Sequence, residues 1–355
     1  MSPSNESLGA GSQLIDKRRI FYTHKPGLNV PTIEILKKCG FTPITEGNCP
    51  ELKPNDLVFL TYCFPFDQWQ EEILNKCLRV GAKSVLILLD LHSFYSSLYG
   101  RQFGYLTLDE EVKQRLYPAH YIIAQTEKMR VFLKEQNIGV PIYVYELFDF
   151  LIDENLAEKF HIDRLNYFEK EEKNRIVYAG IIGNHFRNFL YDDFYHRFKL
   201  DIYDGYKWPE TSYNFPANRF YKGNYSNEEL PFQFQGNYGL IWNNPRLTDA
   251  MRFKELSISS KLGLYVASEL PIIVQEGTAD ADFVKKNLIG FTISDLEEID
   301  SKLDTVTNET YKVWLANLKE FAPKVREGYY LKSCINAILT NFEAMLGVSD
   351  DADTL

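Results

Sequence analysis

The fold of this chain is decided by three neighbouring stretches: Tyr238-Gly-Leu-Ile-Trp-Asn-Asn244, Ser259-Ser-Lys-Leu-Gly-Leu-Tyr-Val-Ala-Ser268 and Leu270-Pro-Ile-Ile-Val-Gln-Glu-Gly277. The apolar runs Gly239–Trp242 and Ile272–Val274 predict buried strands, and Lys261 opens a compact helical pattern between them. This strand–helix–strand unit has a cation where its helix starts and a carboxylate, Glu276, where its second strand ends. Ligands of open α/β sheets bind at the carboxyl ends of strands, and helix amino termini favour phosphate. The pattern therefore predicts a site for a nucleotide diphosphate.

Length and composition describe an ordinary globular protein. The chain has 355 residues, which favours two domains, and 45% of them are hydrophobic while 25% are charged. A net charge of −10 argues against a nonspecific nucleic-acid binder, which needs clustered lysine and arginine. No apolar run approaches the roughly 20 residues of a membrane span, and the first residues lack the pattern of a secretory signal. Five cysteines without a Cys-x-x-Cys pair predict reduced thiols in a cytoplasmic protein.

Strand and helix patterns alternate along both halves of the chain, which predicts an α/β fold built on parallel sheets. In the first half we expect strands at Arg19–Thr23, Asp56–Tyr62, Ser84–Leu89, Tyr121–Ala124 and Ile142–Tyr145, with helices at Pro31–Cys39, Phe66–Arg79 and Glu127–Glu135. In the second half we expect strands at Arg175–Ala179, Lys199–Tyr203, Gly239–Trp242, Ile272–Val274 and Gly290–Ile293, with long helices at Glu309–Phe321 and Tyr330–Met345.

The charged segment Asp153–Asn174 lacks a clean strand pattern, and we interpret it as a linker. The expected domains are an amino-terminal α/β domain at 15–165 and a second α/β domain at 175–330, followed by a helix at 330–347. Residues 1–14 and the acidic tail 348–355 are expected to be disordered. Two α/β halves joined in this way form a cleft, where ligands usually bind.

Four motifs in the second half carry a family resemblance: Tyr238-Gly-Leu-Ile-Trp242, Ser260-Lys-Leu-Gly263, Leu270-Pro-Ile-Ile-Val-Gln-Glu-Gly277 and Leu288-Ile-Gly-Phe291. Together they resemble the glucosyltransferase-3-like family of bacterial GT-B glycosyltransferases, which are related to galactofuranosyltransferases. The match is dense over residues 178–291 and only architectural over the first half, where it places Asp90 and the strand exit at Gln125–Met129. The resemblance implies two Rossmann-like domains facing a central cleft, an acceptor-side domain at 15–165 and a nucleotide-sugar domain at 175–330. It also implies a carboxyl-terminal helix that packs back toward the first domain.

The resemblance also implies three residues that contact the nucleotide-sugar donor. These are Arg187 at the end of Ala179-Gly-Ile-Ile-Gly-Asn-His-Phe-Arg187, Tyr225 in Gly223-Asn-Tyr-Ser-Asn-Glu228, and Lys261. The two cations would neutralise a departing diphosphate, and Tyr225 would stack on the base or hydrogen-bond a phosphate. Gly180 and Gly183 form a loop whose backbone N–H groups can approach phosphate, although an ordinary turn would look the same.

Glu276 and Gly277 follow the second buried strand, where the carboxylate would accept hydrogen bonds from ribose or sugar hydroxyls. The alternative for Glu276 is an acid near the amino end of a helix that starts near Thr278. Asp280-Ala-Asp282 looks like the Asp-x-Asp metal motif of the other large glycosyltransferase fold. We place it in the first turn of that helix, where acids suit the macrodipole, and we expect neither a metal nor a cofactor.

An inverting transferase would need a general base facing the acceptor hydroxyl. Asp90 follows the buried strand Ser84–Leu89 and is the first candidate for this base. His92, two residues further on, and His24, at the exit of the first strand, are the other candidates. Either histidine could equally be a structural hydrogen-bonding residue.

We therefore predict a hexosyltransferase that uses a UDP-sugar, with glucose as the first choice of sugar. The acceptor would be a carbohydrate on a glycoprotein or on a lipid-linked glycan. The alternatives are a UDP-galactofuranose transferase and a non-catalytic GT-B subunit that binds glycoprotein; an epimerase is disfavoured because paired carboxylates with a histidine are missing. Neither a nucleic-acid partner nor a membrane span is expected, and the resemblance suggests a homo-oligomer.

Overall fold

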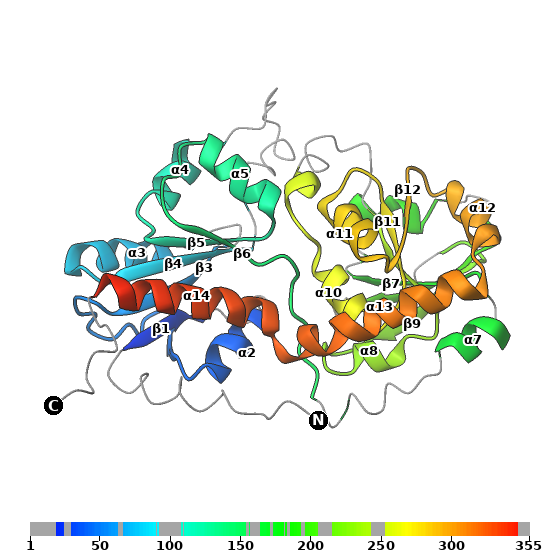
Figure 1. Ribbon diagram of the computed structural model, residues 1–355, viewed down its shortest axis with the longest axis horizontal. Helices are drawn as coiled ribbons and strands as arrows, with labels where there is room; N and C mark the ends of the chain where they lie inside the picture. Colours follow the sequence, from blue (N-terminus) through cyan, green and yellow to red (C-terminus); the bar gives the residue numbers. More distant parts are fainter. Residues whose placement is uncertain are drawn as a thin grey trace, which may run out of the picture. The chain divides into compact units, whose positions relative to one another are not determined.

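The chain forms two compact units in the computed structural model (Figure 1). The first unit contains residues up to Ala124, Arg130–Val144 and the chain from Asn341 onward, and the second contains Gln125–Met129 and Tyr145–Thr340. The structure describes residues 19–24, 30–62, 67–89, 91, 108, 110–153, 156, 164–170, 173–180, 182, 185–192, 196–204, 215–242 and 253–346.

The first unit is built on a six-stranded parallel sheet with the order β2-β1-β3-β4-β5-β6. Its strands are β1 Ile20–Thr23, β2 Thr42–Ile44, β3 Leu57–Tyr62, β4 Lys83–Leu88, β5 Tyr121–Ala124 and β6 Ile142–Val144. Its helices are α2 Val30–Lys38, α3 Gln68–Val80, α4 Glu110–Leu116 and α5 Glu127–Glu135. The strand order reverses between β1 and β3, so α2 lies on one face of the sheet and α4 and α5 on the other (Figure 1).

The second unit holds another six-stranded parallel sheet, with the order β12-β11-β10-β7-β8-β9. Its strands are β7 Arg175–Gly180, β8 Lys199–Asp204, β9 Arg219–Asn224, β10 Tyr238–Ile241, β11 Ile272–Gln275 and β12 Gly290–Ile293. Its helical segments are α7 Arg164–Lys170, η5 His185–Leu190, α8 Leu230–Gln233, α10 Ser260–Ala267, α11 Ala279–Asn287, α12 Glu298–Thr305, α13 Asn308–Glu327 and α14 Tyr329–Met345. Counted within this unit, the order is the 3-2-1-4-5-6 of a Rossmann fold, which reverses between β7 and β10.

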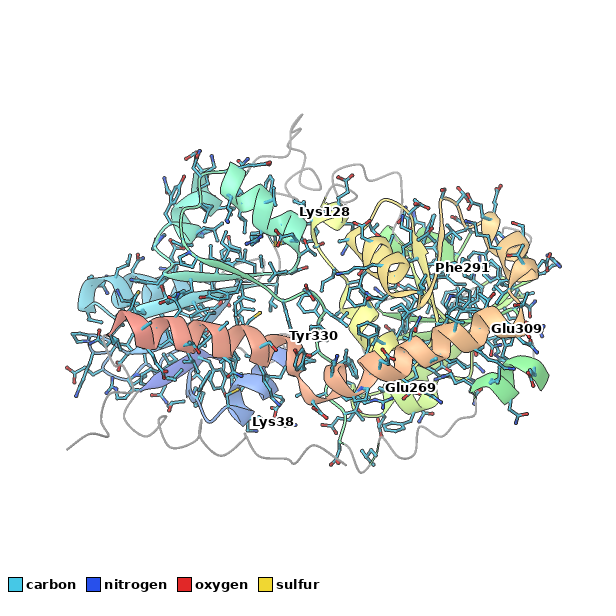
Figure 2. All side chains as sticks on the ribbon, viewed as in Figure 1. Lys38, Lys128, Glu269, Phe291, Glu309 and Tyr330 are labelled. Carbon is cyan, nitrogen blue, oxygen red and sulfur yellow. The ribbon has the colours of Figure 1, made fainter. Side chains whose placement is uncertain are left out.

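Aromatic side chains fill the core on the α13 side of the second sheet. Tyr311 of α13 stacks on Phe168 with ring centroids 4.0 Å apart, and Tyr238 meets both Tyr311 and Trp314 edge to face. Phe291 of β12 joins this cluster, and Figure 2 shows the dense side chains around it. Rings of this size bury a large apolar area, so α13 is fixed firmly against the sheet.

The α/β fold with two parallel sheets is confirmed, and each strand expected from the sequence is present to within two residues. Two strands were not expected, the edge strands β2 and β9, and α7 lies inside the segment interpreted as a linker. The expectation for the last helix is also confirmed, because α14 ends in the first unit, where Tyr121 Oη donates a hydrogen bond to Asn341 Oδ1 at 3.3 Å. None of the described helices is both long enough and apolar enough to cross a membrane.

Candidate functional site

The predicted donor residues lie around the carboxyl ends of the strands of the second sheet. Gly180 is the last residue of β7, Tyr225 follows β9, and Glu276 and Gly277 follow β11. Lys261 is the second residue of α10, the helix that directly precedes β11. Because the strand order reverses between β7 and β10, Gly180 and Lys261 lie at the point where such sheets leave a crevice for a ligand.

Lys261 and Gly180 are in direct contact. A Cβ atom built on Gly180 would lie 2.9 Å from Lys261 Cε and 3.4 Å from its Nζ, so a larger residue there would push the end of the lysine side chain aside. The φ of Gly180 is +153°, a value that other residues rarely adopt. The ammonium group lies 5.5 Å from the centre of the Tyr178 ring, a cation–π distance. A positive charge is therefore held beside the exit of β7.

The start of α10 is fixed by two oxygen atoms. Ser259 caps the helix, and its Oγ accepts a hydrogen bond from the backbone N–H of Lys261 at 3.3 Å. The backbone N–H of Ser259 itself donates to Oδ1 of the fully buried Asp280 at 2.8 Å. Burial raises the pKa of Asp280, while the charges of Lys254 and Lys261 and the Ser259 hydrogen bond act in the opposite direction.

Tyr265 anchors the same helix to the sheet. Its ring lies flat against Gly239 of β10, where an added Cβ would come within 2.5 Å of ring atoms. Its hydroxyl accepts a hydrogen bond from the N–H of Ala179 at 3.0 Å and lies 3.3 Å from the carbonyl oxygen of Leu240. Burial raises the pKa of Tyr265, so this hydroxyl keeps its proton. One side chain therefore ties α10 to both β7 and β10.

The segment that leads into α10 is held by residues from the β5–α5 connection. Gln125 is buried, and its Oε1 accepts a hydrogen bond from the N–H of Ile258 at 3.0 Å. Thr126 Oγ1 donates to the carbonyl oxygen of Leu256 at 2.5 Å. Lys128, labelled in Figure 2, forms an exposed ion pair with Asp282 at 2.6 Å. These contacts explain why Gln125–Met129 belongs to the second unit.

Tyr225 and Glu276 have partners within the second unit. The Tyr225 hydroxyl donates to the carbonyl oxygen of Lys222 at 3.1 Å, and its ring lies 6.1 Å from that of Tyr203. Glu276 is exposed and accepts hydrogen bonds from Lys285 at 2.9 Å and Thr292 at 2.8 Å. The Lys285 hydrogen bond, followed by that of Thr292, lowers the pKa of Glu276. Thr278, rather than Glu276, caps α11, and the exposed Gly277 lies in the turn between them.

Of the base candidates, the structure describes only His24. It follows β1, beside the point where the first strand order reverses, and its backbone N–H donates to the carbonyl oxygen of Ile44 at 2.8 Å. Its ring stacks on Tyr22 with centroids 6.3 Å apart. Asp90, His92 and Gly183 lie outside the described residues, as does the side chain of Arg187, whose backbone forms part of η5.

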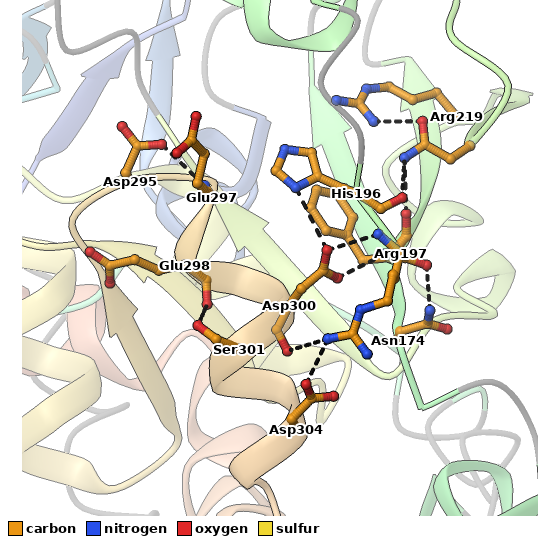
Figure 3. Close-up of polar contacts among 12 residues, drawn as sticks. Asn174, His196, Arg197, Arg219, Asp295, Glu297, Glu298, Asp300, Ser301 and Asp304 are labelled. Carbon is orange, nitrogen blue, oxygen red and sulfur yellow. Dashed lines mark hydrogen bonds and ion pairs between the residues drawn. The ribbon is translucent and has the colours of Figure 1, made fainter.

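A second polar cluster lies at the opposite edge of the second sheet, before β8 begins (Figure 3). Asp300 of α12 accepts hydrogen bonds from the backbone N–H groups of Arg197 at 2.8 Å and Phe198 at 3.0 Å. The Arg197 guanidinium donates to Asp304 at 2.6 Å. This cluster joins α12 to the start of β8. Within the described part of the chain, no three His, Cys, Asp or Glu side chains are grouped to hold a metal ion.

Sequence reasoning did not connect three side chains with Lys261: Tyr178, Tyr265 and Asp280, the last expected only as an acid in the first turn of a helix. The first two resemble core aromatics in their sequence context, and nothing local distinguishes them. For Asp280 the available signal was its place in the first turn after the helix cap Thr278, but Asp282 lies in the same turn. Only the fold separates them, since Asp280 is fully buried and Asp282 is exposed.

Comparison with known proteins matches almost four fifths of the chain to one family. The model described as "Glucosyltransferase 3-like, C-terminal domain" matches residues 176–338, and "Glucosyltransferase 3-like, N-terminal domain" matches residues 32–147. Glucosyltransferase 3 of Streptococcus parasanguinis is 25% identical over 81% of this chain and 79% of its own length. A β-1,6-galactofuranosyltransferase of Escherichia coli K12 is 24% identical over 64% of this chain and 66% of its own length.

Solved structures agree with the fold. A glycosyltransferase from Rickettsia africae superposes with a TM-score of 0.57 at 12% identity, covering 94% of this chain and 100% of that one. The Anabaena protein HepE, solved in complex with UDP-glucose, superposes with a TM-score of 0.56 at 12% identity, covering 91% of this chain and 99% of that one. At these identities the likeness concerns the two-domain α/β architecture alone.

Proposed function

Because this chain belongs to the glucosyltransferase 3-like family and is a glycosyltransferase, we propose that it transfers a hexose from a UDP-sugar to a carbohydrate acceptor. The proposed sugar is glucose, the sugar named for the relatives in S. parasanguinis and Streptococcus gordonii. The proposed acceptor is a sugar already attached to a glycoprotein or to a lipid-linked glycan. We place the enzyme in the cytoplasm and expect it to form a homo-oligomer.

The observation that carries this proposal is the position of Lys261. Its ammonium group lies beside Gly180 at the β7–β10 reversal, at the amino end of α10. Glycosyl transfer from a UDP-sugar releases a diphosphate, whose negative charge increases as the glycosidic bond breaks. A cation fixed at that point stabilises the leaving group in the transition state, and the first N–H groups of a helix add to the effect.

The remaining donor contacts are assigned by chemistry. Arg187 and the loop containing Gly183 follow β7, so they would complete the cradle around the diphosphate. The ring of Tyr225, at the exit of β9, would carry the uracil base or contact a phosphate. The exposed Glu276 would accept hydrogen bonds from sugar or ribose hydroxyls, in exchange for those from Lys285 and Thr292.

Deprotonation of the acceptor falls to the first unit in this proposal. Asp90 is the leading candidate for the general base, with His92 and His24 as alternatives. His24 lies beside the β1–β3 reversal, the corresponding position in the first sheet. Histidine is the side chain that most often acts as a general acid or base in enzymes.

The test is donor turnover with a panel of UDP- and GDP-sugars, combined with the variant Lys261→Met. We expect hydrolysis or transfer with UDP-glucose, and a drop in kcat/KM of about 10- to 100-fold in Lys261→Met, the effect of losing one charge-assisted contact of about 1.5–3 kcal/mol. Lys286→Met, which removes an exposed lysine from the last turn of α11, is the matched control and should behave as wild type. Full activity in Lys261→Met would refute the assigned site.

The galactofuranosyltransferase of E. coli supports one rival, transfer of galactofuranose from its UDP-sugar. The donor panel separates the two proposals. Turnover with UDP-galactofuranose and none with UDP-glucose would change the assigned donor sugar and leave the assigned donor site unchanged. A second rival is a non-catalytic subunit that binds glycoprotein. That reading predicts no turnover with any donor and no change in thermal unfolding when UDP is added.

A further inference from the structure

Asp280 is a buried carboxylate that the donor chemistry does not use directly. It is fully buried in the first turn of α11, and its Oδ1 accepts the hydrogen bond from Ser259 N–H. Its Oδ2 is also buried and has no hydrogen-bond partner among the described residues. Removing a carboxylate from water is costly unless its lone pairs are satisfied. A helix cap does not account for it either, since Thr278 already caps α11.

Asp280 is connected to Lys261 by two short steps. Ser259, which Asp280 holds by its backbone N–H, is the cap of α10, and its hydroxyl oxygen accepts from the N–H of Lys261. The charges of Lys254 and Lys261 also reach Asp280 and favour its ionised form against burial. The carboxylate thus lies behind the turn that carries the candidate donor lysine.

We propose that Asp280 is a positioning residue of the donor site: its carboxylate holds the Ser259 amide and thereby fixes the first turn of α10, so that Lys261 reaches the donor diphosphate from beside Gly180. This inference rests on the proposed role of Lys261. A lysine side chain is long and flexible, so the place of its backbone decides where the ammonium group can act. Misplacement of a charged group by about 1 Å can cost as much as 100-fold in rate.

The test compares Asp280→Ala, Asp280→Asn and Asp282→Ala in the full-length protein. UDP affinity is measured by calorimetry, and the KM for the donor, the KM for the acceptor and kcat by steady-state kinetics. In Asp280→Ala we expect at least tenfold weaker UDP binding and a matching rise in the donor KM, with the acceptor KM unchanged. Asp280→Asn keeps an oxygen atom for the Ser259 amide and should stay within about threefold of wild type. Asp282→Ala, the exposed acid two residues further on, is the matched control and should match wild type.

A double-variant cycle then shows whether Asp280 acts through Lys261. In a Lys261→Met background, Asp280→Ala should weaken UDP binding no further, because coupled residues are not additive. If Asp280→Ala does not fold, Asp280→Leu replaces it: leucine fills the buried site without a charge and still removes the acceptor.

Three results would overturn the proposal. The first is wild-type UDP affinity in Asp280→Ala or Asp280→Leu. The second is a loss of UDP affinity on Asp280→Ala that is as large in the Lys261→Met background as in the wild-type protein. The third is UDP binding by Asp280→Asn that is as weak as UDP binding by Asp280→Ala. Wild-type protein that binds no UDP and turns over no donor would instead remove the proposed function, and the positioning role with it.

Discussion

Replacing Tyr265 with phenylalanine removes one oxygen atom from the centre of the second unit. The ring stays in its place against Gly239, because phenylalanine has the same shape. The N–H of Ala179, which is buried, loses its acceptor at 3.0 Å, and the carbonyl oxygen of Leu240 loses a contact at 3.3 Å. The change therefore isolates hydrogen bonding at the end of β7 from packing.

The expected loss can be worked out from these contacts. A buried donor left without an acceptor costs about 1–3 kcal/mol, and the hydrogen bond that the hydroxyl donates is worth about 1 kcal/mol more. The sum is about 3 kcal/mol. For a unit of this size, each 1 kcal/mol shifts the melting temperature by about 2–4 °C, so Tyr265→Phe should unfold roughly 6–12 °C below wild type.

Scanning calorimetry and urea unfolding measure this loss. Tyr221→Phe is the matched control, since Tyr221 is 44% exposed on the edge strand β9, and its substitution should change stability by less than about 0.5 kcal/mol. A Tyr265→Phe protein as stable as the Tyr221→Phe control would refute the argument. It would mean that the Ala179 amide finds another acceptor without cost.

Three further predictions concern neighbouring features. Gly180→Ala should lose about 1–3 kcal/mol of stability, because alanine is strained in the backbone conformation of Gly180. It should also weaken UDP binding by displacing Lys261. Calorimetry should show no further loss of UDP affinity when Gly180→Ala is added to Lys261→Met. Burial raises the pKa of Asp149 from 3.8 to about 7, so the folded protein holds this proton more tightly than the unfolded chain. The free energy of unfolding should therefore fall as the pH rises from about 4 to about 7. Urea unfolding of Asp149→Asn should show a smaller fall in this free energy over the same pH range. Glu276→Gln should keep the stability within about 1 kcal/mol of wild type, because the ion pair of Glu276 with Lys285 is exposed. It should raise the KM for the donor. An unchanged donor KM would mean that Glu276 does not contact the donor.

The buried strands could be predicted because both faces of a parallel sheet are covered. In β3 and β4 every residue from Leu57 to Tyr62 and from Ser84 to Leu88 is buried, which gives continuous apolar runs. The edge strands lack this signal. β2 has only three residues, with two of them exposed and one a proline, and β9 buries only Arg219 fully. Their pairing is decided by the tertiary fold, so the strand order could not be derived from hydrophobicity.

The candidate site divides in the same way. Lys261 and Gly180 could be found because a cation at a helix start and a glycine at a strand exit have a local meaning. Asp280 and Tyr265 could not, since their roles depend on partners 21 and 86 residues away in the sequence. Their burial is decided by how α10 and α11 pack on the sheet, which local patterns do not record.

Strand order adds a criterion for ranking the site residues that the sequence alone lacked. Strand exits were visible at Gly180, Glu276, His24 and Asp90, and the sequence placed Asp90 ahead of His24 as the general base. The sheet orders distinguish them, because β7 lies beside β10 and β1 beside β3 where each order reverses. Connections leave opposite faces of the sheet at a reversal, so a ligand has room there. This favours Gly180 with Lys261 over Glu276, which lies one strand further along. In the first unit, the strand order places His24 at the reversal between β1 and β3. Asp90 instead follows β4, which lies one strand beyond that reversal. Comparing His24→Ala with Asp90→Ala is therefore the informative experiment for the general base: greater loss of kcat in His24→Ala would move the assignment to the histidine, and greater loss in Asp90→Ala would show that the reversal does not decide where the acceptor is deprotonated.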